Sequence, residues 1–148
     1  MGARPRYLVP VDFSAASARS AEFARELASA TGAEIVYLHV RPQSHLRAAV
    51  AEDRGDLIQG DDALLAQSLA GHYRERLDAL VKDRDRESTK LLVGIPSQEI
   101  CEEAVRGGYA LVFAGPRGRG GVMTSLLGST TQALLARSTV PVVIVPTA

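Results

Sequence analysis

The sequence contains little cysteine and no surplus of either charge. Cys101 is its only cysteine, so an internal disulfide is excluded. Seventeen Lys and Arg residues balance seventeen Asp and Glu residues, whereas a dedicated nucleic-acid-binding protein usually carries a basic excess. We therefore expect no nucleic acid among its partners.

Long hydrophobic runs are also absent. The apolar run Tyr7–Val11 is short and ends at Asp12, which does not fit a signal peptide. The longest run near the C-terminus, Val140–Pro146, is far too short to span a bilayer. We expect no membrane contact and a cytoplasmic location. The length of 148 residues suits a single domain over residues 1–148.

Short apolar segments that do not alternate with polar residues are present, and they predict buried strands of a parallel sheet covered on both faces. They are Tyr7–Val11, Glu34–Val40, Thr89–Val93, Tyr109–Ala114 and Pro141–Val145. Helical patterns separate them: from the cap Ser14 to about Thr31, over roughly Asp61–Lys82, after Pro96, and from Ser129, which has capping-box spacing to Gln132. This alternation predicts an α/β fold with a doubly wound parallel five-stranded sheet and helices on both faces. We expect the strand order 3-2-1-4-5.

Two unusual loops are expected to face each other in that fold. The first places Asp12 at the end of the first strand, and the second runs from Ala114 through a glycine-rich segment to Gly128, at the start of the fourth predicted helix. Ligands of open α/β sheets bind beyond the carboxyl ends of the strands, where the strand order reverses. The predicted order puts that reversal between the first and fourth strands, so both loops should line one crevice.

The composition of these loops suits a nucleotide. Glycines let backbone N–H groups approach an anion closely, and the helix start at Gly128-Ser129-Thr130 offers further N–H donors. Arg117 and Arg119 add positive charge nearby. Asp12 cannot bind phosphate without a metal, but its carboxylate can accept hydrogen bonds from ribose hydroxyls.

Motifs of several other classes are missing. The sequence has no G-x4-G-K-[S/T], which excludes a P-loop nucleotidase, and no G-x-S-x-G elbow of a serine hydrolase. A Rossmann loop would follow the first strand rather than the fourth. A phosphorelay receiver would need an Asp after the third strand, where Gly94 stands. No second His is spaced to form a metal site with His39, so His39 is expected to be structural.

The segments Val11-Asp12-Phe13-Ser14, Gly94-Ile95-Pro96 and Gly115-x2-Gly118-x9-Gly128-Ser129, followed by a Val-rich last strand, resemble the universal stress protein family. The resemblance extends from Arg6 to Pro146 and includes the family's ATP-binding spacing G-x2-G-x9-G-[S/T]. It implies that an adenine nucleotide is bound, namely ATP, or ADP or AMP, with Mg²⁺ held by the phosphates. The implied binding residues are Pro10, Val11, Asp12 (ribose), Val40 (adenine, through its backbone), Ala114, Gly115 and Gly118 (ribose and phosphates), and Gly128, Ser129 and Thr130 (phosphates).

Pro116 departs from the family pattern at the position after the first glycine. Proline has no backbone N–H, so one potential phosphate donor is lost and the choice between ATP and AMP stays open. The last strand, Pro141–Val145, is expected at the sheet edge, and the resemblance implies a homodimer formed there.

The predicted function is regulatory, with nucleotide state reported to a protein partner that the sequence does not identify. No catalytic residue and no protein-bound metal are predicted. Two alternatives stay open: a slow ATPase or phosphotransferase using the same pocket, and a nucleotide-free structural dimer in which Pro116 has disrupted the pocket.

Overall fold

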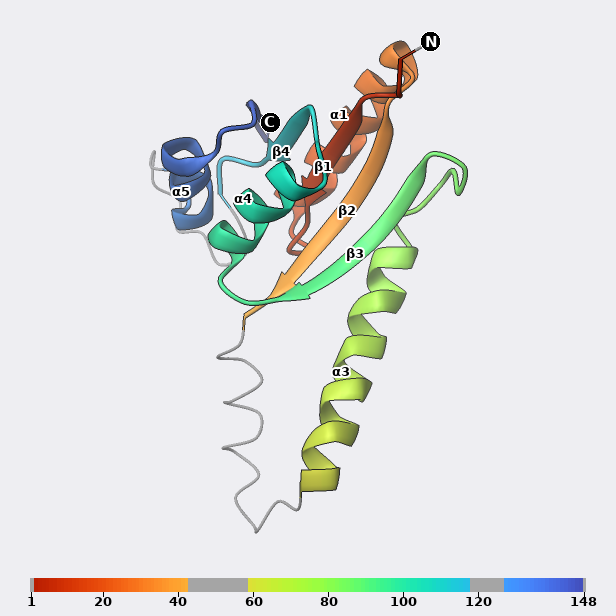
Figure 1. Cartoon of the computed structure of the whole chain (residues 1–148), viewed down its shortest axis with the longest axis vertical. Helices are drawn as coiled ribbons and strands as arrows, with labels where there is room; N and C mark the ends of the chain where they lie inside the picture. The colour runs from red at the N-terminus through yellow and green to blue at the C-terminus, as the bar shows by residue number, and fades with distance from the viewer. Residues whose placement is uncertain (1, 43–58, 118–126, 148) are drawn as a thin grey trace.

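A computed structural model describes residues 2–42, 59–117 and 127–147, with the backbone alone for 59–66. Five parallel strands form one sheet in the order β3-β2-β1-β4-β5 (Figure 1). Their bounds are Arg6–Pro10 (β1), Glu34–Arg41 (β2), Glu87–Val93 (β3), Leu111–Ala114 (β4) and Val142–Ile144 (β5). The expected strand order is confirmed.

Four described helices cover both faces of this sheet: α1 (Ala15–Thr31), α3 (Gln59–Asp78), α4 (Pro96–Arg106) and α5 (Ser129–Arg137). Helices α1 and α3 pack on one face, and α4 and α5 pack on the other (Figure 1). The N-terminal part of α3 extends beyond the sheet. No helix in the described ranges has both the length and the apolar character needed to cross a membrane.

Helix α1 begins and ends where the sequence predicts. The Ser14 hydroxyl accepts a hydrogen bond from the backbone N–H of Ser17 at 3.2 Å, which caps the first turn. At the other end Gly32 adopts φ 75° and donates its N–H to Ala28 at 2.8 Å. Because α1 buries small side chains such as Ala21 and Ala24, it can approach the sheet closely.

Helix α3 ends earlier than predicted, at Asp78 rather than near Lys82. Backbone hydrogen bonds after the helix join residues three apart: Leu80 N–H to Leu77 O, and Val81 N–H to Asp78 O. Such tighter turns commonly finish an α-helix. Leu80 and Val81 still pack against the core, which explains why they continue the helical apolar pattern in the sequence.

Glu103 is a buried carboxylate that connects α4 to neighbouring elements. It accepts hydrogen bonds from Lys90 Nζ at 2.9 Å, Arg106 Nη2 at 2.7 Å and Tyr109 Oη at 3.2 Å. Burial alone would raise the pKa of Glu103, but the bonds from Lys90 and Arg106 outweigh it, so the pKa is lowered. Glu103 is therefore ionised at neutral pH and serves the fold rather than a pocket.

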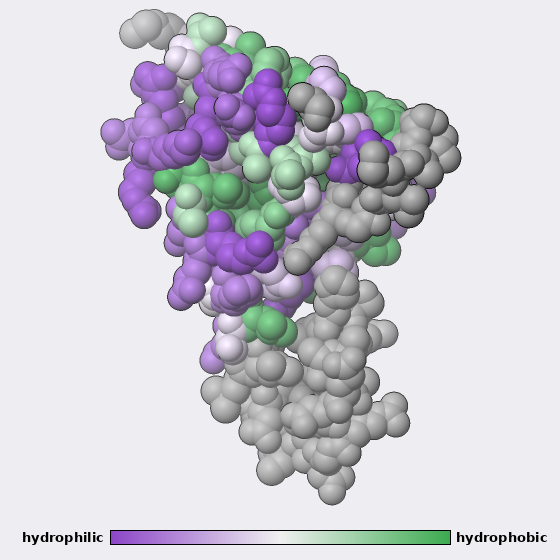
Figure 2. All heavy atoms as spheres, turned by 180° about the vertical axis from the view of Figure 1, so that it is seen from behind, coloured by the Kyte–Doolittle hydropathy of each residue, from purple (hydrophilic) through white to green (hydrophobic). Residues whose placement is uncertain are grey.

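The two long sides of the sheet differ in surface character. Strand β5 is an edge strand, and its residues Val142–Ile144 are only partly buried. In the rear view of Figure 2, hydrophobic surface gathers on the side where β4 and β5 lie, whereas the opposite side is mostly hydrophilic. An apolar edge strand can pair with another chain.

Candidate functional site

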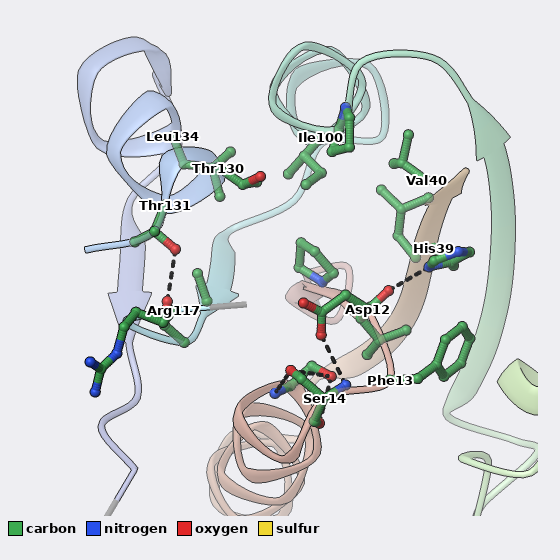
Figure 3. Close-up of a pocket in the computed structure, with 18 of the residues that line it drawn as sticks. Asp12, Phe13, Ser14, His39, Val40, Ile100, Arg117, Thr130, Thr131 and Leu134 are labelled. Carbon is green, nitrogen blue, oxygen red and sulfur yellow. Dashed lines mark hydrogen bonds between the residues drawn. The ribbon is translucent and has the colours of Figure 1, made fainter. Parts of the chain in front are cut away.

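A cavity of about 500 Å³ lies at the carboxyl ends of β1, β2 and β4 (Figure 3). Segments that are far apart in the sequence surround it. Its described walls are Pro10–Ser14, Ser17, Leu38–Val40, Pro42, Tyr73, Pro96, Ile100, Ala114, Gly115, Arg117, Gly128–Thr131 and Leu134. The parallel sheet explains this meeting, because β1 and β4 are neighbours and their connections leave in opposite directions.

Most residues proposed from the sequence line this cavity: Pro10, Val11, Asp12, Val40, Ala114, Gly115, Arg117, Gly128, Ser129 and Thr130. Two further ones, Gly118 and Arg119, lie outside the described residues. The predicted meeting of the Asp12 loop with the start of α5 is therefore present in the structure. That these residues bind a nucleotide stays a prediction.

Asp12 lies on a tight turn between β1 and α1. Its Oδ1 accepts a hydrogen bond from the backbone N–H of Ser14 at 3.0 Å. Figure 3 shows the Asp12 carboxylate among the residues that line the cavity. Phe13, the residue between them, has φ 63°, the only positive value of a non-glycine residue in the described chain. An L-residue in this conformation costs about 1–2 kcal/mol, so other contacts must hold the turn.

The opposite wall is formed by the end of β4 and the start of α5. The Thr131 hydroxyl donates to Gly115 O at 2.7 Å, and the backbone N–H of Gly128 donates to Pro116 O at 2.7 Å. A Cβ on Gly115 would lie 2.9 Å from the Cβ of Ala16 in α1, so the close approach of these elements requires glycine. The wall is thus fixed to both α1 and β4.

Helix α5 begins at Ser129, as predicted, but its capping differs from the prediction. Gly128, not Ser129, is the N-cap, and no side chain caps the helix. Gln132 does not close a capping box because its amide donates to Leu127 O at 2.7 Å instead. Since Gly128 N–H already bonds to Pro116, the donors left for an anion at this helix end are the next backbone N–H groups, beginning at Ser129.

Arg117 belongs to the rim of the cavity. Figure 3 shows its guanidinium pointing away from Asp12. Its position on the lining is therefore as predicted, but its charge is not directed toward the centre of the space between β1 and α5.

An apolar wall lies between the carboxyl end of β2 and helices α4 and α5. Strand β1 ends at Pro10 opposite Leu38, whereas β2 continues to Arg41. The β1 side of β2 near Val40 therefore faces the cavity, while its other side pairs with β3. Pro96 and Ile100 of α4 face it from the other side, together with Leu134 of α5. Sequence analysis did not identify these last three residues, since a helix residue facing a cavity has the same apolar pattern as one facing the core.

Four residues that we call the α3 cluster, Phe13, His39, Tyr73 and Arg76, adjoin the Asp12 turn. The ring centroids of Phe13 and His39 are 4.8 Å apart, and those of His39 and Tyr73 are 4.7 Å apart. The Arg76 guanidinium carbon lies 4.0 Å from the centroid of the Phe13 ring. The cluster joins the site to α3, a contact that neither helix pattern nor strand pattern predicts.

His39 is a buried, hydrogen-bonded histidine, in agreement with the structural role expected from the sequence. It is 8% exposed, and its Nδ1 lies 2.7 Å from the carbonyl oxygen of Val11, to which it donates when protonated there. Burial lowers the pKa of His39, which keeps the ring neutral at neutral pH. Within the described ranges, no group of three His, Cys, Asp or Glu side chains is arranged to hold a metal ion.

Comparison with known proteins gives matches over nearly the whole chain. A model of the universal stress protein family matches residues 4–146. The chain is 23% identical to universal stress protein MJ0577 of Methanocaldococcus jannaschii, over 95% of this chain and 93% of the relative. The solved structure of MJ0577 has a TM-score of 0.81, with 97% of this chain and 96% of that chain covered at 21% identity.

Two further solved structures contain ligands. A universal stress protein in complex with cAMP has a TM-score of 0.61 and 22% identity, over 97% of this chain and 98% of that one. A universal stress protein from Archaeoglobus fulgidus in complex with dAMP has a TM-score of 0.59 and 19% identity, over the same shares of the two chains. At these identities the structural similarity establishes the fold.

Proposed function

Because this chain belongs to the universal stress protein family, we propose that its cavity binds an adenine nucleotide, ATP foremost, and that occupancy regulates a partner protein. One observation carries the proposal. Asp12 and the start of α5, predicted from the sequence to be two ends of a nucleotide site, line the same cavity with an apolar wall between β2 and α4.

The three parts of the cavity match the three parts of a nucleotide. Asp12 provides an acceptor for ribose hydroxyls. The N–H groups at the start of α5 provide donors for phosphate, together with the positive end of the helix dipole. The edge of β2 at Val40 and the side chain of Ile100 provide an apolar part of the lining, which suits the adenine ring.

The relatives with bound ligands support the choice of adenine. cAMP and dAMP are both adenine nucleotides, and both carry a single phosphate. The preference for ATP rests on the glycine spacing of this sequence, with Mg²⁺ carried on the phosphates rather than by a set of protein ligands. The loss of an N–H at Pro116 leaves AMP and ADP as competing ligands to be measured.

A binding role is favoured over rapid hydrolysis by the residues around the cavity. Asp12 is the only carboxylate among its described lining residues, and in this proposal it is occupied by ribose. His39 is neutral, and its Nδ1 is engaged with Val11. The described lining holds no other carboxylate or imidazole that could act as a general base, so at most slow turnover is expected.

The proposal includes a homodimer formed through β5. The apolar edge at Val142–Ile144 supports it, because pairing of two such edges would bury side chains that are partly exposed in one chain (Figure 2). Light scattering at micromolar concentration should give twice the mass of the chain. A monomer under these conditions contradicts this part of the proposal and leaves the nucleotide site unaffected.

The nucleotide proposal is tested by two measurements on the wild-type chain. Mass spectrometry of the denatured protein should release an adenine nucleotide that purified with it. Calorimetric titration of ligand-free protein should then give binding of ATP, ADP or AMP and much weaker binding of GTP. Absence of binding by every adenine nucleotide at millimolar concentration would favour the nucleotide-free dimer, and ADP release well above background would favour the enzyme.

A further inference from the structure

The strained turn that carries Asp12 is attached to α3 rather than held by its own strand and helix alone. Phe13 has φ 63°, a conformation that a bulky side chain rarely adopts. The carbonyl oxygen of Val11, just before Asp12, is bonded to His39 Nδ1 at 2.7 Å. The residues on both sides of Asp12 are therefore fixed by contacts outside the turn.

Residues of α3 contact both Phe13 and His39. The Arg76 guanidinium covers the Phe13 ring at 4.0 Å, and the ring of Tyr73 lies 4.7 Å from that of His39. The Phe13 and Tyr73 rings are also nearly parallel, with 11° between their planes and 6.2 Å between their centroids. The last turns of α3 thus pack against the side chain of Phe13 and against His39, which in turn is hydrogen-bonded to the backbone just before Asp12.

The inference rests on the proposed function: we propose that Tyr73, Arg76 and His39 are positioning residues, through which the docking of α3 holds Asp12 in the orientation that binds ribose. Without the guanidinium over Phe13, the strained residue can relax toward negative φ, and the Asp12 carboxylate turns with it. Nucleotide affinity then falls through the ribose contact, because the Asp12 turn is the part of the site that the cluster adjoins.

By thermodynamic linkage, ribose binding must also affect the docking of α3. If docked α3 favours ribose binding, then bound ribose must favour docked α3 by an equal free energy. Nucleotide binding would thus strengthen the packing of α3, a long helix whose N-terminal part extends beyond the sheet (Figure 1). This assigns α3 as the element that changes with ligand in a regulatory protein.

The test compares ATP with 2′,3′-dideoxy-ATP, which lacks both hydroxyls that Asp12 would bind. Calorimetric Kd values are measured for wild type, Arg76→Met, His39→Leu and His39→Asn, of which the last keeps an N–H donor near Val11 O. The matched control is Arg19→Met on α1, whose guanidinium lies 6.0 Å from the centroid of the Phe23 ring, away from the cavity.

Wild type should prefer ATP about tenfold or more, as expected for a charged acceptor on hydroxyl donors. Arg76→Met should weaken ATP binding about threefold or more and leave the dideoxy nucleotide unchanged. His39→Leu changes a residue of the cavity wall, so it should weaken ATP binding by a larger factor than it weakens binding of the dideoxy nucleotide. His39→Asn should recover part of the loss, and Arg19→Met should change neither Kd. Saturating ATP should slow hydrogen exchange in residues 67–78 of the wild type more than the dideoxy nucleotide does.

Two results overturn the inference while leaving the proposed function intact: an unchanged preference for ATP in Arg76→Met, or equal losses for both nucleotides. If His39→Leu does not fold, Arg76→Met alone decides, because Arg76 is partly exposed and its replacement retains most of the side-chain volume. A wild type that binds neither nucleotide marks failure of the proposed function itself. A wild type that binds both equally refutes the ribose contact of Asp12, and the inference with it.

Discussion

Replacing Asp12 by Asn separates its charge from its role in the backbone turn. The amide oxygen of Asn can still accept the N–H of Ser14, which Asp12 Oδ1 accepts at 3.0 Å, so the turn before α1 should persist. The lost charge lies close to the start of α1 and should lower the free energy of unfolding by about 0.3–1 kcal/mol. The fold is therefore expected to survive the substitution.

The effect on binding should be larger than the effect on folding. A hydrogen bond to a charged group contributes about 1.5–3 kcal/mol and a neutral one about 0.5–1.5 kcal/mol, so the charge accounts for roughly 1–2 kcal/mol. The Kd for ATP should rise about 5- to 30-fold in Asp12→Asn, measured by calorimetry. The Kd for 2′,3′-dideoxy-ATP should not change, because that ligand has no hydroxyl for Asp12 to accept.

Asp83→Asn is the matched control. Asp83 Oδ1 accepts the backbone N–H of Asp85 at 3.0 Å, the same contact that Asp12 makes with Ser14, but on an exposed turn that does not line the cavity. This variant should bind ATP like the wild type. Unchanged ATP affinity in Asp12→Asn, or equal loss for both nucleotides, would refute the ribose assignment of Asp12.

Four further substitutions test the packing and the titrating groups. Gly115→Ala brings a Cβ within 2.9 Å of the Cβ of Ala16, so it should weaken ATP binding and lower the free energy of unfolding by about 1–3 kcal/mol. A wild-type Kd together with a wild-type free energy of unfolding would contradict the close approach of Gly115 to α1. Gly71→Ala, in the interior of α3 with nothing within 4 Å of the new Cβ, should raise the free energy of unfolding by about 0.5–1 kcal/mol in urea titrations, whereas a decrease would indicate a contact not seen here. Glu103→Gln should lower it by about 1–2 kcal/mol at neutral pH; because the pKa of Glu103 is lowered, this difference should disappear as the pH falls through that pKa, and a pH-independent difference would argue against the ion pairs. Burial lowers the pKa of His39 from 6.5; the hydrogen bond to the Val11 carbonyl and the charge of Asp12 oppose this shift, and the charges of Arg76 and Arg41 add to it. The unfolded chain therefore binds a proton more readily, so wild type should lose more stability than His39→Asn between about pH 7.5 and about pH 5.5, and parallel stability curves would contradict a buried neutral ring.

Local sequence patterns were sufficient for the elements of this fold and for two walls of the site. Apolar segments without alternation marked the parallel strands, and Ser14 and Gly32 marked the ends of α1. The acid at the end of the first strand and the glycine-rich segment after the fourth are unusual in composition. Their meeting followed from one topological rule applied to the strand order, without knowledge of any side-chain contact.

Tertiary structure alone decided which other residues complete the site. Ile100 and Leu134 lie on helices whose apolar pattern is the same whether they face a cavity or a core. The α3 cluster joins residues from three segments, namely the turn after β1, strand β2 and helix α3. The positive φ of Phe13 contradicts the local preference of a phenylalanine. Periodicity and propensity are properties of neighbours in the chain. The orientation of Asp12, by contrast, is set by contacts between distant segments that exist only once the helices have packed on the sheet.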